Sequence, residues 1–241
     1  MKLCSKYLIF FLITFLIISC KKLKTPEAIQ ERETWFESFS DSISYYEDLS
    51  KKIDTQIQES NAKISGLLAQ FEKVNNPREV TGYYIIKGWS SHIPLKSTGI
   101  YARINENENL ELIATLSGST FNQIEVGGLY SDIVKHDQAL NYRHATFNTV
   151  FFTGGKADSI AEYISHHEEV NLKLDFIEGK HKSQFVIPTN QKNMISQTWS
   201  LYSSQLEIRK LQKELAICSR KIDTFRRLRD DHSQSKKSYS D

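Results

Sequence analysis

Cysteine and proline are scarce in this sequence, which has three Cys and four Pro among 241 residues. A disulfide-stapled mini-protein needs a much higher cysteine content, and a collagen-like chain needs far more proline and glycine. Aromatic residues make up 11% of the chain and charged residues 25%, which is ordinary globular composition rather than low-complexity disorder. The length and composition therefore allow one or two folded domains.

Neither basic nor acidic residues are in large excess. The chain has 31 Lys and Arg against 29 Asp and Glu, and residues 1–19 hold Lys2 and Lys6 without any acid. Without that segment the chain has 29 basic and 29 acidic residues. Because nucleic-acid binding depends on neutralising many phosphates, this balance argues against a nucleic-acid partner.

Motifs for familiar catalytic and metal sites are absent as well. The sequence has no G-x-S-x-G nucleophile elbow, no H-E-x-x-H zinc motif and no paired Cys ligands. His166-His167-Glu168-Glu169 offers metal-ligand atoms, but adjacent residues point to different faces, so we expect a solvated helix end there. His136-Asp137 and His144 lie in a loop-rich stretch and could join a surface site. We expect no cofactor and no metal.

One loop is suggestive of anion binding. Thr153-Gly154-Gly155-Lys156 lies between an expected strand and an expected helix. Free amide groups at a helix start attract anions, and Lys156 would add a positive charge. A nucleotide-binding P-loop needs G-x-x-x-x-G-K-[ST], however, and this loop lacks the earlier Gly and has Ala157 after the lysine. The pattern favours a simple helix-capping turn, with an anion site at Lys156 as the alternative.

The N-terminus reads as an export signal. Lys2 and Lys6 precede an apolar core from Tyr7 to Ile18. That core is short for a membrane-crossing helix, which needs about 20 apolar residues, but it fits the apolar region of a secretory signal. An uncleaved signal anchor is the alternative.

The end of this segment, Ile17-Ile18-Ser19-Cys20, resembles the bacterial lipoprotein signal. The resemblance implies cleavage before Cys20, diacylglyceryl transfer to its thiol and fatty acylation, such as palmitate, of the new amino group. Two or more acyl chains give stable membrane anchoring. By the sorting preference of such lipoproteins, Lys21 after the cysteine favours the outer membrane, with the protein facing the periplasm. Residues 1–19 are then the signal peptide and residues 20–26 a tether.

Only one cysteine would remain free in the mature protein. Cys4 would leave with the signal and Cys20 would be acylated, so Cys218 could form no internal disulfide. Because Cys218 lies on an apolar helical stripe, we expect a small buried side chain there.

Two segments carry seven-residue apolar spacing typical of paired helices. Residues 27–76 form the first, ending at Asn75-Asn76-Pro77, and residues 190–230 form the second, followed by a polar tail at 231–241 that we expect to be disordered. The apolar residues at heptad positions are Phe36, Phe39, Ile43, Tyr46, Ile53, Ile57, Ile64, Leu67, Phe71 and Val74 in the first, and Leu201, Ile208, Leu211, Leu215, Cys218, Ile222 and Phe225 in the second.

Antiparallel pairing of these helices matches their apolar layers. One register places Ile43 beside Phe225 and Ile53 beside Leu215, and it brings the acids of 27–48 beside the bases of 220–229. We expect an extended coiled-coil hairpin within one chain. A compact wrap around the rest of the protein and an intermolecular coiled coil are the alternatives.

Residues 77–189 show the period-two alternation of strands. Strands are expected at 80–87, 99–105, 110–116, 121–126, 146–153, 170–176 and 183–187, with a hairpin turn at Glu178-Gly179-Lys180 and a short helix at 157–166. The fold class predicted is α+β: two long helices bracketing a mostly antiparallel β-sandwich or open barrel.

Aromatic residues near the first strand suggest a ligand face. Tyr83, Tyr84, Trp89 and His92 cluster there, although such residues also commonly fill a sandwich core. Together these features predict a non-catalytic, lipid-anchored envelope protein whose β-rich domain contacts another envelope protein or a glycan. An adaptor of an export or efflux assembly, similar in architecture alone, is one alternative, and a hydrolase with a site of scattered His and Asp is another.

Overall fold

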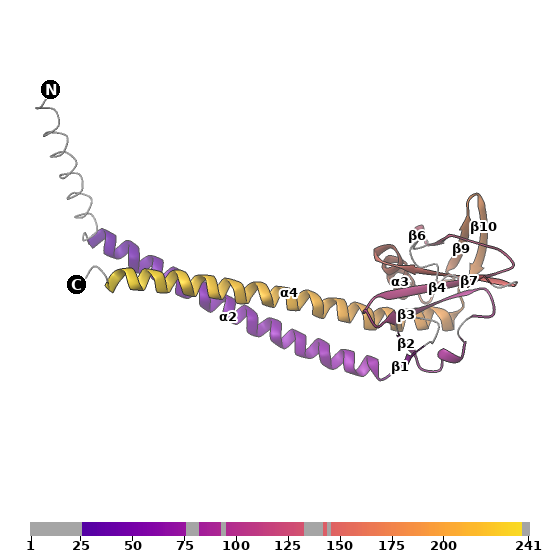
Figure 1. Cartoon of the computed structure of the whole chain (residues 1–241), viewed down its shortest axis with the longest axis horizontal. Helices are drawn as coiled ribbons and strands as arrows, with labels where there is room; N and C mark the ends of the chain where they lie inside the picture. Colours follow the sequence, from indigo (N-terminus) through magenta and orange to yellow (C-terminus); the bar gives the residue numbers. More distant parts are fainter. Residues whose placement is uncertain (1–25, 76–81, 93–94, 133–141, 144–145, 238–241) are drawn as a thin grey trace, which may run out of the picture. The chain divides into compact units, whose positions relative to one another are not determined.

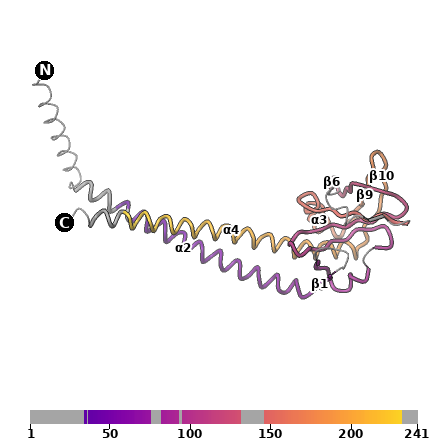
Figure 2. Tube along the Cα trace, viewed as in Figure 1, coloured from indigo at the N-terminus to yellow at the C-terminus, as the bar shows by residue number. Residues whose placement is uncertain are grey.

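The structure is a computed structural model that describes residues 26–75, 82–92, 95–132, 142–143 and 146–237. Figure 1 draws the other residues as a thin grey trace, and Figure 2 shows the Cα path of the chain in the same view. The predicted signal peptide, Cys20, His136, Asp137 and His144 lie outside the described residues.

The chain divides into two compact units, each described here by itself. Residues up to Ile57 and from Leu211 onward form a helical unit, and Gln58–Lys210 form a β-rich unit. Two long helices, α2 (Pro26–Leu68) and α4 (Thr189–Lys237), contribute to both units (Figure 1). The described elements are α+β with antiparallel sheets, as the sequence predicts.

Both long helices form, but their ends differ from the predicted ones. Helix α2 ends at Leu68 instead of residue 76, because Phe71–Val74 becomes strand β1 and pairs with β2 (Tyr83–Ile86). The pairing buries Phe71 in the β-rich core, so tertiary packing outweighs the local heptad pattern. Helix α4 begins at Thr189 and continues to Lys237, past the predicted end at 230. Its last turns contain no Gly or Pro that would terminate a helix.

The larger sheet has six strands in the order β1-β2-β3-β4-β8-β7. Strands β3 (Gly99–Asn105), β4 (Leu110–Ser117) and β8 (Phe147–Thr153) form its centre, and β7 (Tyr142–Arg143) forms one edge. A short 3-10 helix, η2 (Ser90–His92), follows β2. The central strands are buried on both faces, and this burial includes polar side chains such as Arg103, Glu111 and Thr149.

The smaller sheet has four strands in the order β10-β9-β5-β6. Strands β9 (Lys173–Glu178) and β10 (His181–Val186) form the predicted hairpin, whose turn is Gly179-Lys180. Strands β5 (Gln123–Val126) and β6 (Leu129–Asp132) form a second hairpin that was not predicted. Its turn is Gly127-Gly128, and both residues have positive φ, as the type I′ turn of a two-residue hairpin requires.

One core joins the two sheets and the helices of the β-rich unit. The Phe121 ring lies 6.2 Å from the Phe152 ring of the larger sheet and 4.8 Å from the Phe176 ring of the smaller sheet. Helix α3 (Gly155–His166) buries Ile160 in this core, and the first turns of α4 bury Ile195. Aliphatic and aromatic burial of this kind is the main source of stability for such a unit.

The start of α4 also completes the edge of a strand. Strand β2 pairs with β3 at Asn105 and Ile104. Farther along β3, the side-chain carbonyl of Gln191 accepts the Ile100 backbone N–H at 2.9 Å. A Cβ at Gly99 would come within 2.6 Å of the Gln191 amide nitrogen, so a larger residue there would have to displace this side chain.

Candidate functional site

The predicted aromatic cluster does not form one exposed face. Tyr83 is only 4% exposed and belongs to the core, so its ring is not available to a ligand at the surface. Tyr84 and Trp89 are half-buried and pack against the same core, and the Trp89 ring lies 5.6 Å from that of exposed His92. Tyr83 is withdrawn from the surface because it lies with Ile85 on the buried face of strand β2, whereas Tyr84 and Ile86 on the other face are half-buried.

The structure places the predicted anion loop at the start of α3. Gly154 has φ +83° and precedes the helix, and Lys156 is exposed in its first turn. Asp158 lies in the same turn, so the helix start already carries a carboxylate that would repel an anion. The Tyr202 hydroxyl on α4 donates a hydrogen bond to the Asp158 carboxylate at 3.2 Å. Burial raises the pKa of Asp158 above its usual value, against smaller opposite effects of the Tyr202 hydroxyl and the Arg209 charge.

The histidine pair at the end of α3 does not form a metal site. His167 Nδ1 lies 2.8 Å from the Tyr163 carbonyl oxygen, and its ring stacks on the Tyr163 ring with centroids 4.1 Å apart. Among the described residues, no three His, Cys, Asp or Glu side chains lie close enough together to hold a metal ion.

A buried ion pair crosses the larger sheet. Arg103 on β3 lies opposite Glu111 on β4, with Nε to Oε2 at 2.6 Å and side-chain exposures of 2% and 6%. The Arg103 guanidinium lies 4.0 Å from the centre of the Tyr83 ring and 4.9 Å from that of Phe151. Asn105 donates its amide N–H to the other carboxylate oxygen at 2.9 Å. This depth suits a structural role rather than recognition of a ligand.

One face of the smaller sheet carries a row of polar side chains, of which Gln184, Lys182 and Tyr130 are exposed, whereas Asp175 is buried and Glu125 mostly so. Gln184, Asp175, Glu125 and Tyr130 lie opposite one another in a row across all four strands, and Lys182 lies beside them. Lys182 Nζ is 2.8 Å from Asp175 and 3.0 Å from Glu125, and these carboxylates raise the pKa of the lysine. The Tyr130 side chain is 47% exposed. We call these five residues the polar row.

Sequence reasoning identified only part of the polar row. The alternation around Asp175 showed that one side of its strand is polar. Glu125 lies on the predicted strand at 121–126, but its place beside Asp175 depends on the pairing of β5 with β9. Tyr130 lies on the unpredicted strand β6, whose one readable signal is the Gly127-Gly128 turn.

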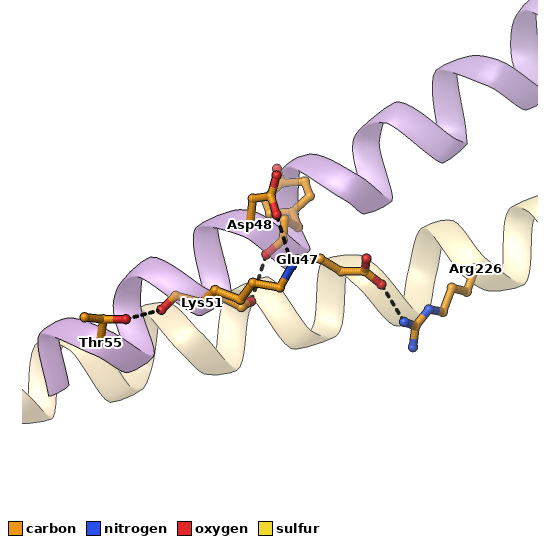
Figure 3. Close-up of polar contacts among 7 residues, drawn as sticks. Glu47, Asp48, Lys51, Thr55 and Arg226 are labelled. Atoms are coloured by element: carbon orange, nitrogen blue, oxygen red, sulfur yellow. Dashed lines mark hydrogen bonds and ion pairs between the residues drawn. The ribbon is translucent and has the colours of Figure 1, made fainter. Parts of the chain in front are cut away.

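The helical unit has its own specific contacts between α2 and α4. The Phe225 ring lies 6.2 Å from the Phe39 ring and 5.9 Å from the Tyr46 ring, on which it stacks. Arg226 Nη2 donates to Glu47 Oε1 at 2.7 Å, and Figure 3 shows these two side chains reaching toward each other from the two helices. Cys218 is buried in this unit, as predicted.

Within the parts of the chain that the structure describes, no helix is long and apolar enough to cross a membrane. Comparison of the chain with known protein families, with curated proteins and with solved structures gives no match.

Proposed function

We propose that this chain is a lipid-anchored, non-catalytic protein of the bacterial cell envelope that presents its β-rich unit to another envelope component. In this proposal Cys20 carries the lipid, and α2 and α4 form an antiparallel coiled-coil hairpin that serves as a stalk. The sequence around Cys20 supports the anchor, since Ser19-Cys20 follows an apolar segment of signal-peptide length.

The observation that carries the stalk is the packing around Phe225. Its ring contacts Phe39 and Tyr46, which flank Ile43, and the heptad register places Phe225 beside Ile43. The Arg226–Glu47 pair lies half-exposed at the edge of this layer, so it contributes only about 0–1 kcal/mol and mainly favours one register. Ile43 and Ile53 on α2 and Cys218 and Ile222 on α4 are the buried residues of this seam.

The polar row is the surface that we assign to the partner. It combines the exposed Tyr130 side chain with the exposed amide of Gln184 and the ammonium of Lys182, which the mostly buried carboxylates of Asp175 and Glu125 hold in place. Such groups can hydrogen-bond either a polar protein surface or the hydroxyls of a glycan. An exposed Tyr adds contact area at a low entropic cost.

Metabolic labelling with a fatty-acid analogue tests the anchor. The wild-type chain is expected to incorporate the label and to stay with membranes, whereas Cys20→Ala is expected to lose the label. A Cys20→Ala product that still labels would contradict the assignment of the lipid to this residue.

Chemical cross-linking tests the stalk in the full chain. Glu47→Cys and Arg226→Cys are introduced into a Cys218→Ala background and treated with a bis-maleimide, and a protease site is placed in the exposed Gly179-Lys180 turn. After cleavage under denaturing conditions, the two fragments are expected to stay joined. The matched variant Glu47→Cys with Lys213→Cys, whose α4 position points away from the seam, is expected to separate.

Photo-cross-linking in intact cells tests the partner surface. A benzophenone amino acid at position 130 is expected to form adducts with an envelope component, and the same group at exposed Lys96 is the control. Equal adducts from both positions, or none from 130, would contradict the role of the polar row.

A further inference from the structure

The helical unit exposes an unusual number of large apolar side chains. Trp35 and Tyr45 on α2 are 61% and 63% exposed, and Ile217 and Leu228 on α4 are 48% and 40% exposed. Single exposed apolar residues are common, but a contiguous apolar patch indicates an interaction surface. The question is therefore whether these four residues share one side of the unit.

The Arg226–Glu47 pair shows which positions of the two helices lie on the same side of the helical unit. Glu47 follows the seam residue Tyr46, Arg226 follows the seam residue Phe225, and the two meet. On antiparallel helices, the positions just after the seam lie on one side of the pair, and the positions just before it lie on the other.

All four exposed apolar residues occupy positions just before the seam. Tyr45 precedes Tyr46, and Ile217 precedes Cys218. Trp35 precedes Phe36 of the heptad series that includes Ile43, and Leu228 precedes position 229, which continues the series of Leu215 and Ile222. Trp35, Tyr45, Ile217 and Leu228 thus line the side opposite the Arg226–Glu47 pair. We call this the apolar side.

We propose that the apolar side is a dimer interface, in which the same side of a second copy packs against it to form a four-helix bundle. This inference rests on the helix pairing proposed above. A two-fold axis parallel to the helices would place α2 of each copy against α4 of the other, so each apolar side would meet an identical one.

Charge complementarity identifies a second copy as the occupant. With Ile43 level with Phe225, Asp41 is level with Arg227, and Asp48 is level with Arg220. These four residues lie two positions from the nearest seam residues, so within one chain the acids and bases point away from each other. Across the proposed interface they flank the contact between α2 and α4, at matching levels.

The same charges select the orientation of the two copies. A two-fold axis perpendicular to the helices would place α2 against α2 and α4 against α4, bringing acids beside acids and bases beside bases. Such like-charge pairs are unfavourable, so the parallel axis is preferred. It also places both copies of Cys20 at one end, as two chains anchored in one bilayer require.

A charge-reversal experiment on the full chain in detergent micelles tests the interface. One variant carries Asp41→Lys and Asp48→Lys, and the other carries Arg220→Glu and Arg227→Glu. Each alone is expected to weaken its homodimer roughly tenfold or more, since every flanking contact becomes repulsive. Mixed with differently tagged chains, the two variants are expected to co-purify as a heterodimer of wild-type strength.

A neighbouring pair of substitutions tests which side is used. Tyr45→Lys places a charge on the apolar side, and Ser44→Lys places the same charge on the side of the Arg226–Glu47 pair. Sedimentation is expected to show a loss of dimer for Tyr45→Lys and an unchanged dimer for Ser44→Lys, with equal helicity by circular dichroism.

The outcomes separate this inference from the proposed stalk. A wild-type chain that stays monomeric while the 47–226 cross-link forms within one chain would overturn the dimer alone. Equal dimerisation of both charge-reversal variants and the wild type would also overturn it. Failure of the 47–226 cross-link would overturn the helix pairing and the dimer together.

Discussion

The buried Arg103–Glu111 pair makes the stability of the β-rich unit sensitive to the loss of either charge. In Glu111→Leu, the Arg103 guanidinium would keep its buried position between two aromatic rings but lose its carboxylate. Removing one member of a buried ion pair costs about 3–5 kcal/mol, because the remaining charge is left without compensation. The amide of Asn105 would lose an acceptor in the same variant.

Replacement of both charges gives the sharper test of this explanation. Arg103→Met with Glu111→Leu fills similar volume without leaving a buried charge. Because replacement of a whole buried pair by apolar residues is often neutral or stabilising, the double variant is expected to be more stable than either single variant. The interaction energy between the two sites is then large and opposite in sign to the single losses.

A chemically matched pair at the surface provides the control. Arg209 lies 2.8 Å from Glu108, and their side chains are 33% and 58% exposed. Arg209→Met is expected to cost only about 0–1 kcal/mol, since solvent screens this pair.

Urea unfolding of the full chain, followed by tryptophan fluorescence, measures these effects. A Trp35→Phe background leaves Trp89 and Trp199, which both report on the β-rich unit. Losses below about 1 kcal/mol in both Glu111→Leu and Arg103→Met, or a double variant as unstable as the sum of the singles, would refute the reasoning.

Three further substitutions test individual contacts of the β-rich unit by the same urea assay. Gly127→Ala is expected to cost more than Gly128→Ala: both have positive φ, but only at 127 would a Cβ meet the Tyr163 ring, at 2.3 Å. Equal losses would contradict the steric explanation. Lys192→Met is expected to cost about 1–3 kcal/mol, because the buried ammonium donates to two backbone carbonyls after α3; a neutral effect would refute this role. The raised pKa of Asp158 means that ionisation disfavours folding, so stability should fall as the pH rises through the folded pKa. Asp158→Asn should lessen that fall, and an unchanged pH profile would contradict the assignment.

Secondary structure is predicted best from the sequence where a single hydrophobic periodicity, either of a strand or of a helix, determines the element. The alternation of Leu174 and Phe176 with polar residues, followed by Gly179, identifies the β9–β10 hairpin, because only one face of that sheet meets the core. The seven-residue spacing of the long helices likewise identifies α2 and α4, whose interiors contain no proline.

Other features depend on contacts that a periodic pattern does not contain. Phe71 fits the heptad spacing of α2, yet strand pairing with Ile86 places it in β1. Arg103 and Glu111 look like solvent-facing charges, and only the register of β3 and β4 brings them together inside the protein. Tyr83 looks like a surface ligand-binding residue in the sequence, because its burial results from tertiary packing of the sheet and not from the local pattern.

The pairing of α2 with α4 is the central claim of this account, and a distance measurement tests it most directly. Spin labels are placed at Ser44→Cys and Asp223→Cys in full-length Cys218→Ala chains, diluted with unlabelled wild-type protein so that only distances within one chain are recorded. Paired helices lie about 8–10 Å apart, so the labels are expected to give one narrow distribution within about 20 Å. A broad distribution well beyond about 20 Å, or a short distance that vanishes on dilution, would contradict the intramolecular hairpin.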